Sequence, residues 1–79
     1  MHRSEYVKRC CILIGQHIEN LREERNMTLE EMSQKTGIRI EYLKRIEAGI
    51  AYRVKVIPHL ALIAKALKIT MMELFSFEK

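Results

Sequence analysis

Two short helices separated by a glycine turn are the feature of this sequence that most restricts its fold. Thr28 and Glu31 have the spacing of a capping box, in which each side chain accepts a hydrogen bond from the other residue's backbone amide at the start of a helix. Gly37 then offers the left-handed backbone conformation that commonly ends a helix. These signals predict a helix over residues 29–36.

A second helix is predicted over residues 40–48, where Gly49 supplies the next helix end. At about 100° per residue, Tyr42, Leu43 and Ile46 share one side of this helix. The other side carries Ile40, Glu41, Lys44, Arg45 and Ala48. We therefore expect the first side to pack on a core and the second to meet solvent or a partner.

Hydrophobic periodicity predicts helices on both sides of this pair. Apolar residues at steps of four and three predict a long amphipathic helix over about residues 5–24, with Ser4 as its N-cap. A second apolar stripe predicts a helix over residues 58–67, and Pro58 suits its first turn.

The end of the chain repeats the capping signal. Thr70 and Glu73 form a second capping box, which predicts a short helix over residues 71–75. The segment Ile50–Ile57 alternates apolar and basic residues, so we expect an extended arm or loop there. The sequence thus predicts an all-α fold in which residues 1–79 form a single five-helix domain.

Composition restricts the classes of function. The net charge of +4 and the pI of about 9.3 favour polyanionic or acidic partners. No nucleophile–base constellation and no glycine-rich phosphate loop is present, so we expect no enzyme, no cofactor and no small-molecule ligand. No apolar run reaches the roughly 18 residues of a membrane helix, and no signal peptide is recognisable. The expected setting is the cytoplasm.

The adjacent cysteines Cys10 and Cys11 are poor disulfide partners within one helix, so we expect a reduced, partly buried pair. The alternative is a redox sensor, for which the nearby Lys8 and Arg9 are the only favourable signal. No metal site is expected, because metal-ligand spacing is missing among His2, His17 and His59.

The order of these features resembles the lambda-repressor/Cro family, also called the xenobiotic-response-element (XRE) family. The matching residues are Arg22, Thr28, Glu31, Gly37, Ile38, Tyr42, Ile46, Glu47, Gly49, Ala64, Ala66 and Leu67. The resemblance spans about Ile14 to Phe75. It implies a five-helix lambda-repressor-like domain with a helix-turn-helix, in a DNA-binding transcription regulator encoded by a bacterium, a phage or a plasmid. It also implies that Arg22 pairs with Glu47.

In a helix-turn-helix protein, the second helix of the motif enters the major groove of double-stranded DNA. The resemblance therefore makes Ile40, Glu41, Lys44 and Arg45 the candidates for contacting base edges. The candidates for contacting phosphates, which position the protein without recognising sequence, are Thr28, Leu29, Arg39, Tyr42, Tyr52, Arg53 and Lys55. Between Arg39 and Lys55, five basic residues stand against two acidic ones, which favours a polyanionic partner.

The resemblance leads to two hypotheses about partners. The first is a homodimeric repressor on a pseudo-palindromic operator, with Met71, Met72, Phe75 and Phe77 as the candidate dimer interface. The second follows from the stretch from Thr36 to Gly49, which also resembles the cytoplasmic helix-turn-helix domain of the RodZ family. That resemblance implies an adaptor that binds a cytoskeletal protein without binding an operator.

Overall fold

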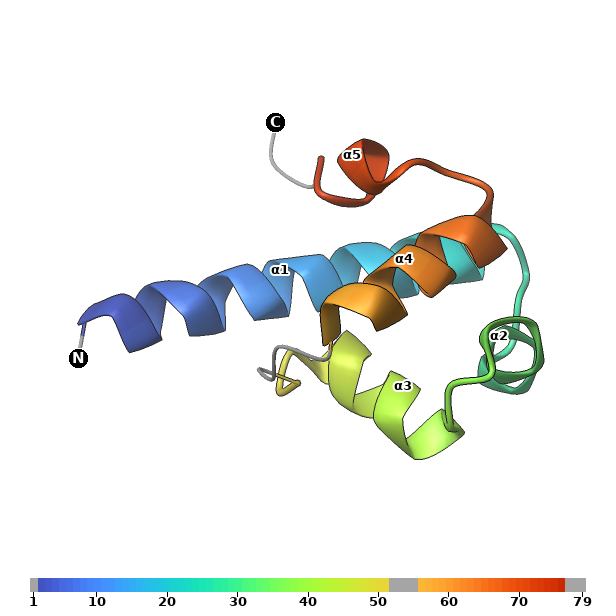
Figure 1. The fold of residues 1–79 in the computed structure, drawn as a ribbon, viewed down its shortest axis with the longest axis horizontal. Helices are drawn as coiled ribbons and strands as arrows, with labels where there is room; N and C mark the ends of the chain where they lie inside the picture. The colour runs from blue at the N-terminus through green and yellow to red at the C-terminus, as the bar shows by residue number, and fades with distance from the viewer. Residues whose placement is uncertain (1, 52–55, 77–79) are drawn as a thin grey trace.

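The computed structural model of the chain describes residues 2–51 and 56–76, and these residues form an all-α fold (Figure 1). The fold class predicted from the sequence is confirmed. The helices are α1 (His2–Glu24), α2 (Leu29–Thr36), α3 (Ile40–Ala48), α4 (Val56–Leu67) and α5 (Met71–Leu74). The predicted bounds of α2 and α3 agree with the structure.

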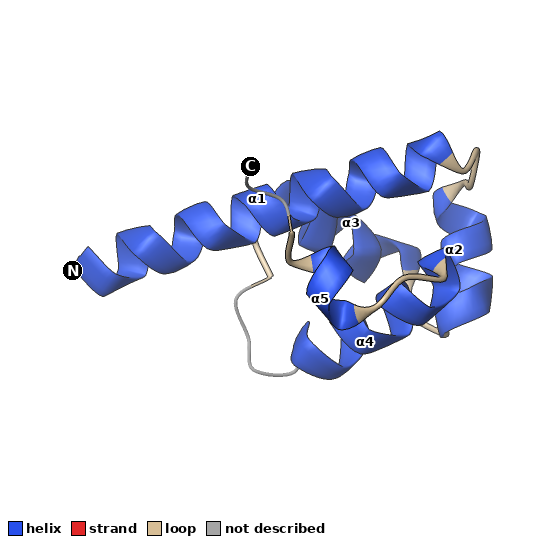
Figure 2. Cartoon of the chain, turned by 90° about the horizontal axis from the view of Figure 1, so that it is seen from above, coloured by secondary structure: helices blue, strands red, loops and turns tan. Residues whose placement is uncertain are grey.

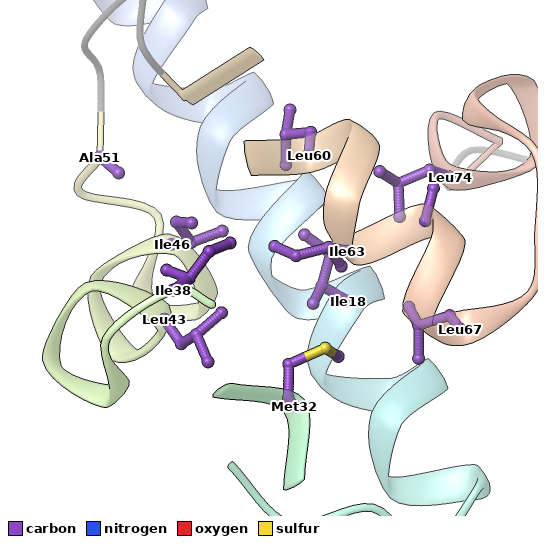
Figure 3. Packing of buried hydrophobic residues seen from close by; sticks show 11 residues of the cluster. Ile18, Met32, Ile38, Leu43, Ile46, Ala51, Leu60, Ile63, Leu67 and Leu74 are labelled. Carbon is purple, nitrogen blue, oxygen red and sulfur yellow. The ribbon is translucent and has the colours of Figure 1, made fainter. Parts of the chain in front are cut away.

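The core is a single cluster to which every helix contributes at least one fully buried side chain (Figure 3). These side chains are Ile18 of α1, Met32 of α2, Leu43 of α3, Ile63 and Leu67 of α4, and Leu74 of α5. A helix as short as α5 is not stable in water by itself. The burial of Leu74 is therefore what holds α5 on the bundle.

The long helix α1 extends beyond this core at its N-terminal end (Figures 1 and 2). At a rise of about 1.5 Å per residue it measures about 34 Å, close to the 37 Å long axis of the molecule. Val7, in this N-terminal part of α1, is an apolar residue that remains 41% exposed. No helix among the described residues combines the length and hydrophobicity that crossing a membrane requires.

The start of α1 differs from the prediction. The helix already begins at His2, so Ser4 lies inside its first turn and the prediction of Ser4 as N-cap is wrong. Glu5 in that turn is favourable because a carboxylate complements the positive end of the helix dipole. The other end closes at Asn26, whose φ of 53° is left-handed.

Two glycines allow α1 and α3 to approach each other closely. A Cβ atom added to Gly15 would lie 2.5 Å from the carbonyl oxygen of Glu47 and nearer still to that of Ile46. A Cβ atom added to Gly49 would lie 2.6 Å from the Cα atom of Ile12. Since side chains cannot tolerate such distances, the backbone contact between α1 and α3 depends on both glycines.

The start of α4 corrects a second prediction. Val56 and Ile57 belong to this helix and are not extended, whereas residues 52–55 lie outside the described residues. Val56 packs against the core and precedes the buried Leu60 by four residues, so it continues the apolar stripe of α4. Tertiary burial thus outweighs the strand-like alternation of the sequence. At the C-terminal end, α5 stops at Leu74, one residue before the predicted bound.

Candidate nucleic-acid interface

The turn between α2 and α3 is held by side chains of α2. The hydroxyl of Ser33 donates a hydrogen bond to the carbonyl oxygen of Ile38 at 2.5 Å. The hydroxyl of Thr36 donates to the carbonyl oxygen of Met32 at 2.8 Å and accepts from the amide of Ile38 at 3.1 Å. Gly37 has the expected left-handed φ of 77°. These bonds fix the angle at which α3 leaves the turn.

The outer side of α3 carries the candidates for contacting bases. Glu41, Lys44 and Arg45 are exposed, and Ile40 is half-buried beside them. Within residues 5–51 and 56–76, none of the three charged side chains takes part in a hydrogen bond or an ion pair. On the inner side, Leu43 and Ile46 are buried. One side of the helix is therefore packed on the core, and the other side exposes charged groups that make no hydrogen bond or ion pair with the described residues.

Arg22 of α1 connects α1 to α3 through Glu47. Its guanidinium donates two hydrogen bonds to the carboxylate of Glu47, at 2.8 and 3.1 Å. A third goes to the carbonyl oxygen of Met27 at 2.8 Å. The bond to Glu47 raises the pKa of Arg22 despite the opposing effect of burial. This ion pair is nearly buried, with 11% and 8% of the two side chains exposed.

The candidates for contacting phosphates differ in whether their side chains are free to reach DNA. Arg39 is exposed and its side chain does not cap α3. Thr28 uses its hydroxyl to cap α2, accepting from the amide of Glu31 at 3.1 Å. Leu29 packs against the core, so it offers DNA only its backbone amide. Residues 52–55, which include the candidates Tyr52, Arg53 and Lys55, lie outside the described residues.

The comparison with known families agrees with this geometry. A family model described as helix-turn-helix matches residues 18–74, which is most of the chain. The protein belongs to the helix-turn-helix family of the lambda-repressor/Cro (XRE) type. Members of this family are DNA-binding regulators, so a DNA-binding role holds for this helix-turn-helix protein in general terms. No curated protein and no solved structure matched the chain.

Sequence reasoning missed one residue beside the interface of this helix-turn-helix protein. His59 of α4 packs its ring edge-on against Tyr42 of α3, with ring centroids 4.9 Å apart and an interplanar angle of 66°. Both residues are half-buried. A single histidine within an apolar helix carries no pattern that assigns it a role, so only the fold reveals this contact.

The candidate dimer residues differ in exposure. Met71 packs against the core, Met72 is 80% exposed, and Phe75 is 41% exposed. Phe77 lies outside the described residues. Phe75 lines an apolar hollow of about 150 Å³ together with Cys11, Ile14, Ile46, Ala51, Val56, Ile57 and Leu60. An apolar surface of this kind is available for a partner.

Cys10 and Cys11 are free and half-buried. Burial, followed by the neighbouring Cys10, raises the pKa of the Cys11 thiol. A raised pKa reduces the thiolate fraction, which disfavours a redox-sensing role for Cys11. Among the described residues, no three His, Cys, Asp or Glu side chains cluster in a way that would hold a metal ion.

Proposed function

We propose that this helix-turn-helix protein represses transcription by binding a pseudo-palindromic operator as a homodimer, with α3 in the major groove. The observation that carries the proposal is the outer side of α3. Glu41, Lys44 and Arg45 are exposed there without partners in the described part of the chain, while the core and the pair of Arg22 with Glu47 fix the helix. A rigid helix with uncommitted charged groups suits the recognition of base edges.

Each candidate side chain has a chemistry that suits a base. Lys44 or Arg45 would donate to O6 and N7 of guanine, and Glu41 would accept from N4 of cytosine. Ile40 would contact the methyl group of thymine. Each good pair of hydrogen bonds contributes about 1–3 kcal/mol of discrimination between bases.

Dimerisation is supported by the apolar surface of α5 and its surroundings. Met72 and Phe75 expose apolar surface that the described core does not use, and Ile57 beside the hollow is also exposed. Figure 1 draws α5 above α1 and α3 below it, and the apolar hollow meets α3 only through Ile46, which lies on the buried side of that helix. A dimer contact through α5 and this hollow would therefore leave the outer side of α3 in each copy uncovered. We expect Met72→Glu/Phe75→Glu to convert a dimer into a monomer in sedimentation experiments, and a monomeric unsubstituted protein would contradict the dimer.

The experiment that tests operator binding is selection of bound duplexes from a random pool at two salt concentrations. The proposal predicts an enriched, pseudo-palindromic sequence and binding that weakens steeply with salt, because phosphate contacts release counterions. The variant Lys44→Glu/Arg45→Glu should lose binding to the enriched duplex.

A matched control reverses the same charges elsewhere. Lys8→Glu/Arg9→Glu changes one exposed lysine and one exposed arginine on α1, so its net charge equals that of the α3 variant. The proposal predicts that this control keeps the sequence preference. A folded protein that enriches no sequence would contradict operator binding, and would favour the alternative of a protein-binding adaptor.

A further inference from the structure

Two hollows beside α3 share part of their walls. The first lies on the outer side of α3 and is lined by Arg39, Glu41, Tyr42 and Arg45. The second lies towards α4 and is lined by Gly37, Ile38, Arg39, Tyr42 and His59. Since both include Arg39 and Tyr42, the surface continues from the candidate base-contacting side chains to the imidazole ring of His59.

The ring of His59 lines this second hollow and packs against the ring of Tyr42. Its Nδ1 atom is buried and has no hydrogen-bond partner among the described residues. A buried N–H group without an acceptor is less tolerable than an unused lone pair. The proton of the neutral ring therefore belongs on Nε2, which makes the half-exposed ring a hydrogen-bond donor.

The other polar groups of the hollow are donors as well. Arg39 is exposed, and neither its guanidinium nor the hydroxyl of Tyr42 has a hydrogen-bond partner within the described residues. None of the five residues that line this hollow carries a carboxylate. A hollow that offers a guanidinium, a phenol and an imidazole N–H suits an anion with several acceptor oxygens.

We propose that this hollow binds one DNA phosphate in each half-site, with His59 as a direct hydrogen-bond donor beside Arg39 and Tyr42. The inference rests on the proposed function, because a phosphate reaches this hollow only when α3 lies in the major groove. In that arrangement the DNA backbone runs along the edge of the groove, next to the side chains that contact bases. The hollow adjoins those side chains and faces the backbone from the α4 side.

The test combines protein variants with uncharged phosphate analogues. In each duplex of the selected sequence one backbone phosphate is replaced by a methylphosphonate, and the set of duplexes covers every backbone position. Dissociation constants are measured for the unsubstituted protein, His59→Ala, His59→Gln and Tyr42→Phe. Lys65→Ala, an exposed position on the same helix as His59, is the matched control, and thermal unfolding establishes that each variant folds.

We expect His59→Ala to weaken binding of the unmodified duplex by about 3- to 10-fold, the usual effect of one hydrogen bond. One methylphosphonate position per half-site should weaken binding of the unsubstituted protein but have little further effect on His59→Ala or Tyr42→Phe. His59→Gln, which retains an N–H donor, should recover part of the affinity. Lys65→Ala should remain sensitive at that position.

The inference would be overturned if the losses of binding free energy from His59→Ala and from the methylphosphonate were additive at every backbone position. Two changes that remove the same contact should not be additive. In that case the proposed function still stands if Lys44→Glu/Arg45→Glu abolishes binding to the selected duplex. If the unsubstituted protein selects no duplex, both the proposed function and the phosphate contact fail together.

Discussion

The guanidinium of Arg22 on α1 holds the carboxylate of Glu47 on α3 through two hydrogen bonds, at 2.8 and 3.1 Å. The same guanidinium donates to the carbonyl oxygen of Met27, the residue before the N-cap of α2. One side chain therefore connects the ends of α1, α2 and α3. This contact is nearly buried, whereas the charged candidates for contacting bases are exposed. It therefore positions the candidate interface without taking part in it.

Glu47→Ala should cost about 3 kcal/mol of unfolding free energy, because it leaves a nearly buried guanidinium without its carboxylate. Chemical denaturation measures this loss. Glu24→Ala, which removes an exposed carboxylate of α1 that does not act on Arg22, is the control and should stay within about 0.5 kcal/mol. Equal effects of the two substitutions would show that the ion pair contributes nothing specific. The hydrogen bond to Glu47 raises the pKa of Arg22, so the guanidinium stays protonated despite its burial.

Gly15→Ala should destabilise the protein, although alanine usually stabilises a helix by about 1 kcal/mol relative to glycine. The added Cβ atom would lie 2.5 Å from the carbonyl oxygen of Glu47, so α1 and α3 must move apart. We expect a net loss of about 1–3 kcal/mol in denaturation experiments. Gln16→Ala, at the exposed neighbouring position, should be neutral. A more stable Gly15→Ala protein would contradict the close contact of the two helices.

The bounds of α2 and α3 were predictable from the sequence because their signals are local. Thr28 and Glu31 form both bonds of the capping box, and Gly37 and Gly49 have the expected left-handed conformations. Capping depends on residues only a few positions apart, so no tertiary information is needed.

Long-range packing explains what the sequence could not predict. The contact of Gly15 with the C-terminal part of α3 and the contact of His59 with Tyr42 join residues from different helices. The helical state of Val56 depends on its burial against the core, which its strand-like neighbourhood conceals. Such features arise only when helices have been placed relative to each other.

Lys68→Gly should stabilise the protein. Lys68 ends α4 with a φ of 61°, a left-handed conformation that costs a residue with a Cβ atom about 1 kcal/mol. Glycine adopts it without strain, and part of this gain is offset by the greater freedom of glycine in the unfolded chain. We expect a net gain of up to about 1 kcal/mol in thermal unfolding. Lys65→Gly, inside the same helix, should instead lose about 1 kcal/mol.

Cys11 should react slowly with iodoacetamide in the folded protein. Burial raises the pKa of its thiol, and the charge of Cys10 adds to this effect. In Cys10→Ser, the pH midpoint of the Cys11 alkylation rate should lie above the midpoint for the same chain unfolded in urea. In the folded unsubstituted protein, where Cys10 is present, the midpoint for Cys11 should be higher than in folded Cys10→Ser. A folded-state midpoint below the unfolded one would indicate an activated thiol.

Arg45→Ala tests whether the outer side of α3 recognises bases. Dissociation constants are measured for the unsubstituted protein and for Arg45→Ala on the selected duplex and on each of its single base-pair variants. If α3 recognises bases, the unsubstituted protein should discriminate by about 1–3 kcal/mol at each contacted position. Arg45→Ala should lose this discrimination at one symmetric pair of positions and keep it elsewhere. A uniform loss of affinity on every duplex would contradict base recognition by Arg45.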